Sequence, residues 1–176
     1  MAESYKDVFV AQQQRLAANP AGALATILVE TLQARGLASE ARLRDFRLVL
    51  DEPTEIGGAD RGPSPIELVL AALGACQEIT YRLYADTLGI PLRGVSVRLE
   101  GRLDYRGLFA VKDGIRPGFR DVRAIVAIDS PASAEDLDRL KATVDRHCPV
   151  LDILRNVTPV QVGIEHVNSV IAPAAA

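Results

Sequence analysis

The sequence predicts an α+β domain in which a largely antiparallel sheet surrounds one buried central helix. Segments with strand-like alternation occur in pairs, and a long helical segment, apolar on every side in its first half, lies between two such pairs. The chain has 176 residues, which fits one domain of roughly 100–200 residues. We expect a helical extension over 1–20, a single domain over 21–168 and a disordered tail over 169–176.

Composition and charge narrow the function classes. Hydrophobic residues make up 48% of the chain and charged residues 24%, which is typical of a globular protein rather than a disordered one. The net charge of −3 argues against a nucleic-acid binder, which needs a basic surface. No stretch approaches the ~18 apolar residues of a membrane helix, and the first residues do not resemble a signal peptide. We therefore expect a cytoplasmic protein that binds neither nucleic acid nor a membrane.

One helix and one hairpin are expected before the central helix. Residues 4–18 carry a weak apolar stripe, and an Asn-Pro pair ends it. Residues 23–34 and 40–50 alternate in the manner of strands. Arg35 and Gly36 lie between them, at the expected hairpin turn. A loop rich in glycine and proline follows.

The central helix, expected over 65–88, has the clearest signals in the chain. Ser64 and Glu67 form a capping box, and Pro65 stands at the first helical position. A glycine directly follows the last helical residue. The run over 68–75 is apolar all round, which indicates a helix covered by protein on every side. One short sheet covers too little of it, so we expect a homodimer that sandwiches these helices between two sheets.

Further strands and helices are expected after the central helix. Alternation predicts strands over 95–103 and 122–128, and a final strand over 160–164. Ser133 is expected to cap a second helix. The apolar stripe of that helix consists of Leu137, Leu140 and Val144.

Cys76 and Cys148 are the side chains best suited to covalent chemistry. Two thiols cannot form a disulfide framework, and His147 and His166 lack metal-ligand spacing, so we expect neither a metal nor a cofactor. Cys76 lies in the apolar helix, where a free cysteine commonly packs as a small hydrophobe. Pro149 is expected to begin a short helix with Cys148 at its N-cap, where the helix dipole lowers a thiol pKa. The residues alone leave an inert pair and a redox-active pair both open.

Two segments resemble the OsmC/Ohr family. Gly57-Gly58 together with the run GPSPIELVLAALGAC over 62–76 resembles the first cysteine segment of that family, and HCPV over 147–150 resembles the second. The resemblance extends from about Ala23 to Val167. It implies the OsmC-like fold, an intertwined α+β homodimer with active sites at the interface.

The same resemblance implies thiol-dependent reduction of organic hydroperoxides, with electrons from a dithiol such as a lipoylated protein. In position, Cys76 resembles the peroxidatic thiolate, which becomes a sulfenic acid. Cys148 resembles the resolving thiol, which closes a disulfide that the dithiol reopens. Arg35 is similar in position to the arginine that stabilises the thiolate. Arg61, in the loop before the central helix, is a second candidate.

Other site residues have two interpretations each. In the best-known peroxidases of the family, the arginine-binding glutamate stands one residue earlier, where this chain has Ile66. Glu67 is therefore either a site residue or only a helix cap. Phe109 and Phe119 belong to a loop over 106–119 and would line an apolar substrate entrance or cover the dimer core.

Two other functions compete with the peroxidase. One is an OsmC-like dimer that binds a small apolar or electrophilic ligand without peroxidase turnover. The other is a structural protein with two inert core cysteines. The distance between the two thiols separates these hypotheses, because a disulfide needs Cα atoms within about 7 Å.

Overall fold

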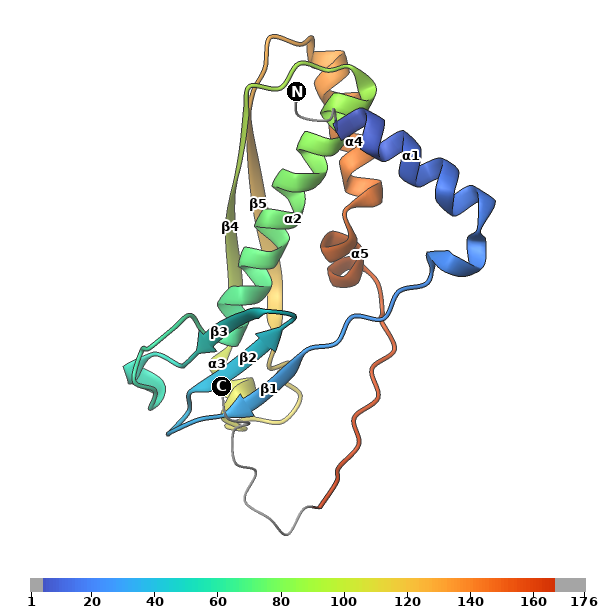
Figure 1. The fold of residues 1–176 in the computed structure, drawn as a ribbon. Coiled ribbons are helices and arrows are strands. Elements are labelled where there is room, and N and C mark those ends of the chain that lie inside the picture. Colours follow the sequence, from blue (N-terminus) through green and yellow to red (C-terminus); the bar gives the residue numbers. More distant parts are fainter. Residues whose placement is uncertain (1–4, 167–176) are drawn as a thin grey trace. The chain divides into compact units, whose positions relative to one another are not determined.

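The computed structural model describes residues 5–166, so the tail predicted over 169–176 lies outside the described residues. It has the α+β character that the sequence predicts (Figure 1). The elements in chain order are α1 (Tyr5–Ala18), the 3₁₀ helix η1 (Pro20–Ala23), β1 (Glu30–Gln33), β2 (Ser39–Leu43), β3 (Phe46–Leu50), the 3₁₀ helix η2 (Thr54–Ile56), α2 (Pro65–Leu88), β4 (Gly94–Leu103), α3 (Tyr105–Leu108), β5 (Phe119–Asp129), α4 (Ala134–His147) and α5 (Pro149–Arg155).

The chain folds as two compact units. One unit holds α1, η1, α2 from Leu68 onward and every element from β4 to α5. The other holds β1, β2, β3, η2, the first residues of α2 and, among the described residues, 156–166.

The predicted central helix is confirmed, because α2 begins at Pro65 and ends at Leu88. The Oε2 atom of Glu67 accepts hydrogen bonds from the backbone N–H and the hydroxyl of Ser64, at 2.7 and 2.8 Å. The backbone N–H of Glu67 donates in return to Ser64 Oγ at 3.4 Å. Gly89 follows with φ +70°, a left-handed conformation that glycine adopts at little cost and that ends the helix.

Within this chain α2 is buried along one face rather than on every side. The residues on the buried face are Leu73, Gly74, Gln77, Thr80, Tyr81 and Ala85. Ala72, Ala75 and Ile79 are exposed, and Ile79 has an exposed fraction of 67%. Their spacing places them on one stripe of the helix. The chain by itself therefore leaves an apolar stripe of α2 uncovered.

The antiparallel pairing of the strands is confirmed, but they form two sheets where the prediction had one. The first sheet has the order β1-β2-β3, and the second pairs β4 with β5. Ser39 lies opposite Leu50 in the first sheet, and Gly94 lies opposite Asp129 in the second. The long β4–β5 ladder contains one register shift, next to Leu103.

The strand predicted over 40–50 is wrong, because this segment is a tight hairpin of two strands. Leu43 pairs with Phe46 across the turn. Arg44 reaches the turn conformation with φ +56°, which is unusual for a residue with a side chain. No glycine marks this turn, and the polar–apolar alternation continues through it, so the pattern does not reveal it.

Two other strand predictions are also corrected. Of the segment 23–34, four residues pair with β2, while Leu24, Ile27 and Leu28 before them are exposed. The final strand expected over 160–164 does not form within residues 5–166, and its Ile164 has an exposed fraction of 99%. Alternation gives a segment the surface of a strand, but a strand also needs a partner to accept and donate its backbone hydrogen bonds.

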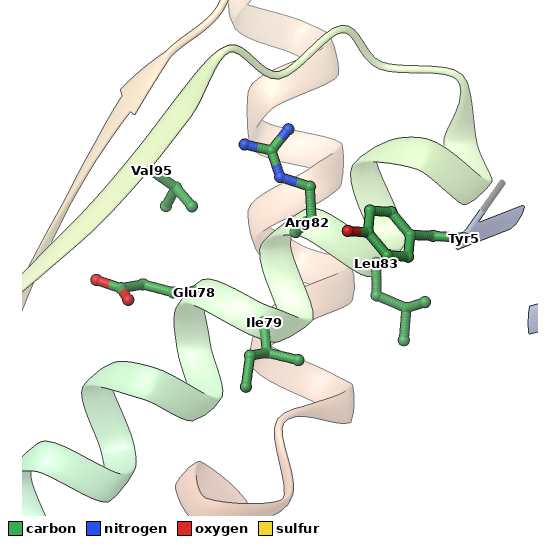
Figure 2. Close-up of a pocket in the computed structure, with 6 residues that line it drawn as sticks. All are labelled: Tyr5, Glu78, Ile79, Arg82, Leu83 and Val95. Carbon is green, nitrogen blue, oxygen red and sulfur yellow. The ribbon is translucent and has the colours of Figure 1, made fainter. Parts of the chain in front are cut away.

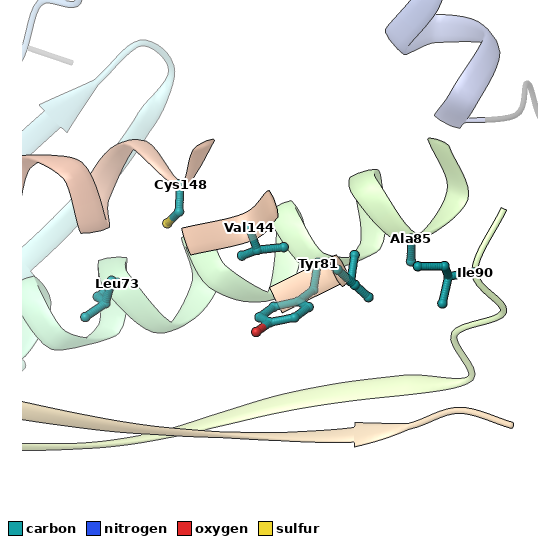
Figure 3. Close-up of a cluster of buried hydrophobic side chains, with 7 residues drawn as sticks. Leu73, Tyr81, Ala85, Ile90, Val144 and Cys148 are labelled. Atoms are coloured by element: carbon teal, nitrogen blue, oxygen red, sulfur yellow. The ribbon is translucent and has the colours of Figure 1, made fainter. Parts of the chain in front are cut away.

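The core of the first unit lies where α2, α4 and α5 meet the β4–β5 sheet (Figure 3). Leu140 and Val144 of the predicted α4 stripe are fully buried, and Leu137 packs against the same cluster. A Cβ atom added at Gly74 would lie 3.0 Å from Leu99 Cδ1. Glycine therefore lets α2 approach β4 closely. The other members of the buried cluster are Leu73, Tyr81, Ala85, Ile90 and Cys148.

The junction between α4 and α5 agrees with the prediction. Ser133 caps α4, and its hydroxyl accepts a hydrogen bond from the Asp136 backbone N–H at 3.1 Å. The Cys148 N–H donates to the Val144 carbonyl, and the Cys148 carbonyl accepts from the Asp152 N–H. Cys148 therefore ends α4 and stands directly before Pro149, the first residue of α5.

Candidate active site

The two cysteines, 72 positions apart in sequence, lie together in the first unit. Cys148 Sγ donates to Cys76 Sγ across 3.2 Å. Cys76 comes from the middle of α2 and is partly buried, whereas Cys148 at the α4–α5 junction has an exposed fraction of 1%. Disulfide sulfurs are about 2.05 Å apart. A small movement of either side chain therefore brings the two sulfurs to bonding distance.

Hydrogen-bond donors surround the Cys76 sulfur, and their effect opposes that of burial. Burial raises the pKa of the Cys76 thiol, and the neighbouring Cys148 raises it further. Hydrogen bonds from the Val150 backbone N–H and the Thr80 hydroxyl lower this pKa, but the net direction is upward. These donors alone therefore do not make Cys76 a low-pKa thiol while Cys148 is reduced.

Thr80 and Val150 are site residues that the sequence analysis missed. Thr80 stands four positions after Cys76, so both lie on one face of α2. Its Oγ1 atom is 2.6 Å from the Cys76 carbonyl oxygen, to which it donates. Helical spacing places Thr80 on the face of α2 that carries Cys76, but this spacing by itself does not single out a site residue. No sequence signal indicates Val150, because its contribution comes from the backbone.

Arg35, Arg61 and Glu67 belong to the second unit, whereas both cysteines belong to the first. Arg35 lies in the turn between β1 and β2, where Gly36 has φ +68°. The Arg35 carbonyl accepts from Arg61 Nη2 at 2.9 Å. The structure thus brings Cys76 to Cys148 within one unit and Arg61 to the Arg35 backbone within the other, and the pairing of an arginine with the thiol stays a prediction.

The loop that carries Arg61 is organised around Asp51, which the sequence analysis also missed. The Asp51 side chain has an exposed fraction of 1%, and Arg61 Nε lies 3.5 Å from its Oδ2. Backbone N–H groups of Glu52, Ala59 and Arg61 donate to the same carboxylate at 2.9, 3.2 and 3.3 Å. Desolvation opposes the charge on Asp51, but these donors and the Arg61 side chain hold its pKa below the usual value.

Glu67 and the two phenylalanines have defined surroundings. Hydrogen bonds from the Ser64 backbone and hydroxyl lower the pKa of Glu67, so its carboxylate acts here as a helix cap. Phe109 follows α3 and is exposed, with its ring 6.3 Å from that of Tyr105. Phe119 begins β5 and packs tightly over Gly101, since a Cβ atom there would lie 2.4 Å from its ring.

A separate pocket of about 420 Å³ lies in the first unit (Figure 2). Its charged side chains are held by the backbone: Arg82 donates to the Leu92 and Arg93 carbonyls, and Glu78 accepts from the Val97 N–H at 3.2 Å. The remaining wall is apolar. The pocket is lined by Tyr5, Glu78, Ile79, Arg82, Leu83 and Val95.

Other kinds of site are not found in the part of the chain that the structure describes. No cluster of three or more His, Cys, Asp or Glu side chains within residues 5–166 is placed to hold a metal ion. Over the same residues, no helix combines the length and the apolar character that crossing a membrane requires.

The fold and the paired thiols define an α+β protein with a candidate dithiol site. The family model for OsmC-like proteins matches residues 57–163, which include both cysteines, and the chain belongs to this family. No curated protein sequence matches the chain.

Solved structures show the same fold. An OsmC-like protein from Mycoplasma pneumoniae is 22% identical with a TM-score of 0.66, over 76% of this chain and 89% of that one. An organic hydroperoxide resistance protein OsmC from Legionella pneumophila is 25% identical with a TM-score of 0.58, over 76% and 91%. An organic hydroperoxide resistance protein from Elizabethkingia anophelis, with thiocyanate bound, is 20% identical with a TM-score of 0.58, over 75% and 89%.

Proposed function

We propose that the protein is a thiol-dependent peroxidase that reduces organic hydroperoxides through Cys76 and Cys148. The observation that carries this proposal is the 3.2 Å separation of the two sulfurs. Inert core cysteines have no need to meet, and these come from segments 72 positions apart. The names of the Legionella and Elizabethkingia relatives support hydroperoxides as the substrate class.

In the proposed reaction, the Cys76 thiolate attacks the distal oxygen of the hydroperoxide and breaks the O–O bond. The leaving alkoxide takes a proton and departs as an alcohol, while Cys76 becomes a sulfenic acid. Cys148 Sγ then attacks the Cys76 sulfur, so that water leaves and a disulfide forms. An external dithiol, such as a lipoylated protein, reduces this disulfide by two exchange steps and is itself oxidised.

Arg35 is the cation that we propose for the thiolate. A guanidinium stays charged at every relevant pH and stabilises a neighbouring anion. Arg61 already lies beside the Asp51 carboxylate and donates to the Arg35 carbonyl. Among residues 5–166, Arg35 takes part in no comparable ion pair, so its guanidinium is the more available of the two. For Glu67 we propose that the main role is to cap the N-terminus of α2.

We also propose that the protein works as a homodimer in the cytoplasm. The exposed stripe of Ala72, Ala75 and Ile79 supports the dimer. Burying such an apolar surface against a second copy of the chain would remove it from water and stabilise the assembly. The free thiols support a reducing compartment. Phe109 and Phe119 are proposed to line the apolar substrate entrance.

Free-thiol titration before and after one equivalent of cumene hydroperoxide tests the peroxidase. We expect the wild-type chain to lose both thiols, and Cys76→Ser to keep its remaining thiol. We expect Cys148→Ser to lose its thiol to a sulfenic acid that dimedone traps. Two intact thiols in the wild-type chain at a low excess of oxidant would overturn the proposal.

The second candidate function is binding of a small apolar ligand without turnover. The pocket of about 420 Å³ beside Ile79 and Leu83 favours it, because its charged groups are already bound to backbone atoms. Saturable binding of cumyl alcohol, together with an unchanged thiol count after hydroperoxide, would support this function over the peroxidase.

A further inference from the structure

Thr80 places a hydroxyl group beside the proposed peroxidatic cysteine. It lies one helical turn after Cys76 on the same face of α2, and it is buried. Its Oγ1 atom donates to the Cys76 carbonyl oxygen at 2.6 Å. A helical threonine has two accessible χ1 rotamers, one of which makes this bond to the carbonyl four residues earlier.

The surroundings of Thr80 give its hydroxyl two acceptors within one residue. One acceptor is the Cys76 carbonyl. The other is the Cys76 sulfur, which lies within hydrogen-bonding reach of the Thr80 side chain and faces Cys148 Sγ at 3.2 Å. The hydroxyl carries a single hydrogen. A thiolate is a stronger acceptor than a thiol because hydrogen bonds to charged groups are the stronger ones. The hydrogen is therefore expected to turn toward the sulfur when Cys76 loses its proton.

We propose that Thr80 is a further catalytic residue, whose hydroxyl turns from the Cys76 carbonyl to the Cys76 sulfur and stabilises the thiolate before it attacks the hydroperoxide. This inference rests on the proposed function, since it assigns a role at the same sulfur. The Thr80 hydroxyl and the Val150 N–H both lower the pKa of Cys76, against the larger effect of burial. The unit that holds both cysteines thus supplies part of the stabilisation within itself.

Thr87 provides a matched control in the same helix. Its Oγ1 atom donates to the Leu83 carbonyl at 2.8 Å, which is the same bond to the carbonyl four residues earlier. Thr87 is near the end of α2, two turns beyond Thr80. Replacing it by valine removes the same type of hydroxyl without touching the thiols.

The test is the pH dependence of Cys76 alkylation by iodoacetamide, with the modified site located by mass spectrometry. We expect Thr80→Val to move the midpoint to higher pH and to slow alkylation below it by on the order of tenfold. Thr80→Ser keeps the hydroxyl and is expected to restore the wild-type profile, and Thr87→Val is expected to leave it unchanged. If the valine variant does not fold, Thr80→Ala is the alternative, because it also removes the hydroxyl and introduces no β-branched side chain.

An unshifted midpoint in a folded Thr80→Val or Thr80→Ala variant would overturn the role of Thr80. A purely structural role would change thermal stability and leave the midpoint in place. Alkylation needs no hydroperoxide, so this result is separate from the thiol titration above. If the midpoint shifts but hydroperoxide does not oxidise the thiols, the peroxidase proposal is wrong while the hydrogen bond from Thr80 to the Cys76 thiolate is supported.

Discussion

The Arg61 guanidinium holds the turn that carries Arg35, because its Nη2 atom donates to the Arg35 carbonyl at 2.9 Å. The same guanidinium lies 3.5 Å from the Asp51 carboxylate through Nε. One planar side chain thus joins the β1–β2 turn to the loop after β3. The conformation of the Arg35 backbone therefore depends on a residue 26 positions away.

Arg61→Lys is expected to loosen the Arg35 turn. Lysine keeps the positive charge, but its single ammonium group does not reproduce the planar fork that spans two partners. Hydrogen–deuterium exchange should become faster at the Ala38 N–H, which donates to the Arg35 carbonyl. Arg47→Lys, at an exposed pair with Glu40, is the control. Equal exchange at Ala38 in the wild-type and Arg61→Lys chains would show that the guanidinium does not hold the turn.

Arg35→Ala is expected to raise the apparent pKa for alkylation of Cys76 if Arg35 stabilises the thiolate. The loss of a nearby positive charge makes the anion less favourable. The measurement is the pH profile of iodoacetamide modification at Cys76, with Arg47→Ala as the control for a lost surface charge. An unchanged profile for Arg35→Ala would remove Arg35 from the site.

Asp51→Asn is expected to destabilise the fold in a pH-dependent way. Backbone N–H donors and Arg61 hold the folded pKa of Asp51 below its ordinary value of 3.8, so the contribution of this carboxylate to stability is fully present above that value. The contribution is lost as the pH falls through the lower folded pKa. Urea unfolding at several pH values should show that the wild-type chain has the higher free energy of unfolding, and that its advantage over the variant becomes smaller as the pH falls. A difference in the free energy of unfolding that stays constant between pH 3 and pH 7 would show that the charge on Asp51 does not stabilise the fold.

Tyr81 is expected to titrate later than an ordinary tyrosine. Burial raises the pKa of Tyr81 to about 12, and the negative charge of Asp145 adds to the effect. Burial also raises the pKa of Tyr84, so absorbance at 295 nm should show Tyr81 as the last of the four tyrosines to ionise, and Tyr81→Phe should remove that last step. The associated stability is present below the unfolded pKa of about 10 and declines as the pH rises toward the folded value. An unchanged last step near pH 12 in Tyr81→Phe would contradict the assignment to Tyr81.

The sequence was most informative where the structural signal is local. Ser64, Pro65 and Glu67 mark the start of α2, and a single glycine marks its end, so both bounds of α2 are as predicted. The hairpin turn at Arg44 was missed because an arginine there has no feature of a turn residue. The final strand was wrong because alternation describes the surface of a segment and says nothing about its partner.

The candidate site was predictable to the extent that side chains define it. Cys76 and Cys148 follow from residue type and from the family resemblance, and the structure brings them together. Asp51 was not predictable, because three of its four partners are backbone N–H groups of a loop. Thr80 was accessible to helical spacing, but a threonine one turn from a cysteine is too common to attract notice.

The 72-position spacing between the paired sulfurs has a consequence for the stability of an oxidised form of the protein. A bond between them would tie α2 to the α4–α5 junction and close a loop containing the whole β4–β5 hairpin. Closing a loop of this length restricts the unfolded chain and stabilises the fold by on the order of 4 kcal/mol. The oxidised form should therefore melt at a higher temperature than the reduced form, and Cys148→Ser should show no such difference. Resistance to unfolding and to proteolysis would then be greatest in the disulfide-bonded form.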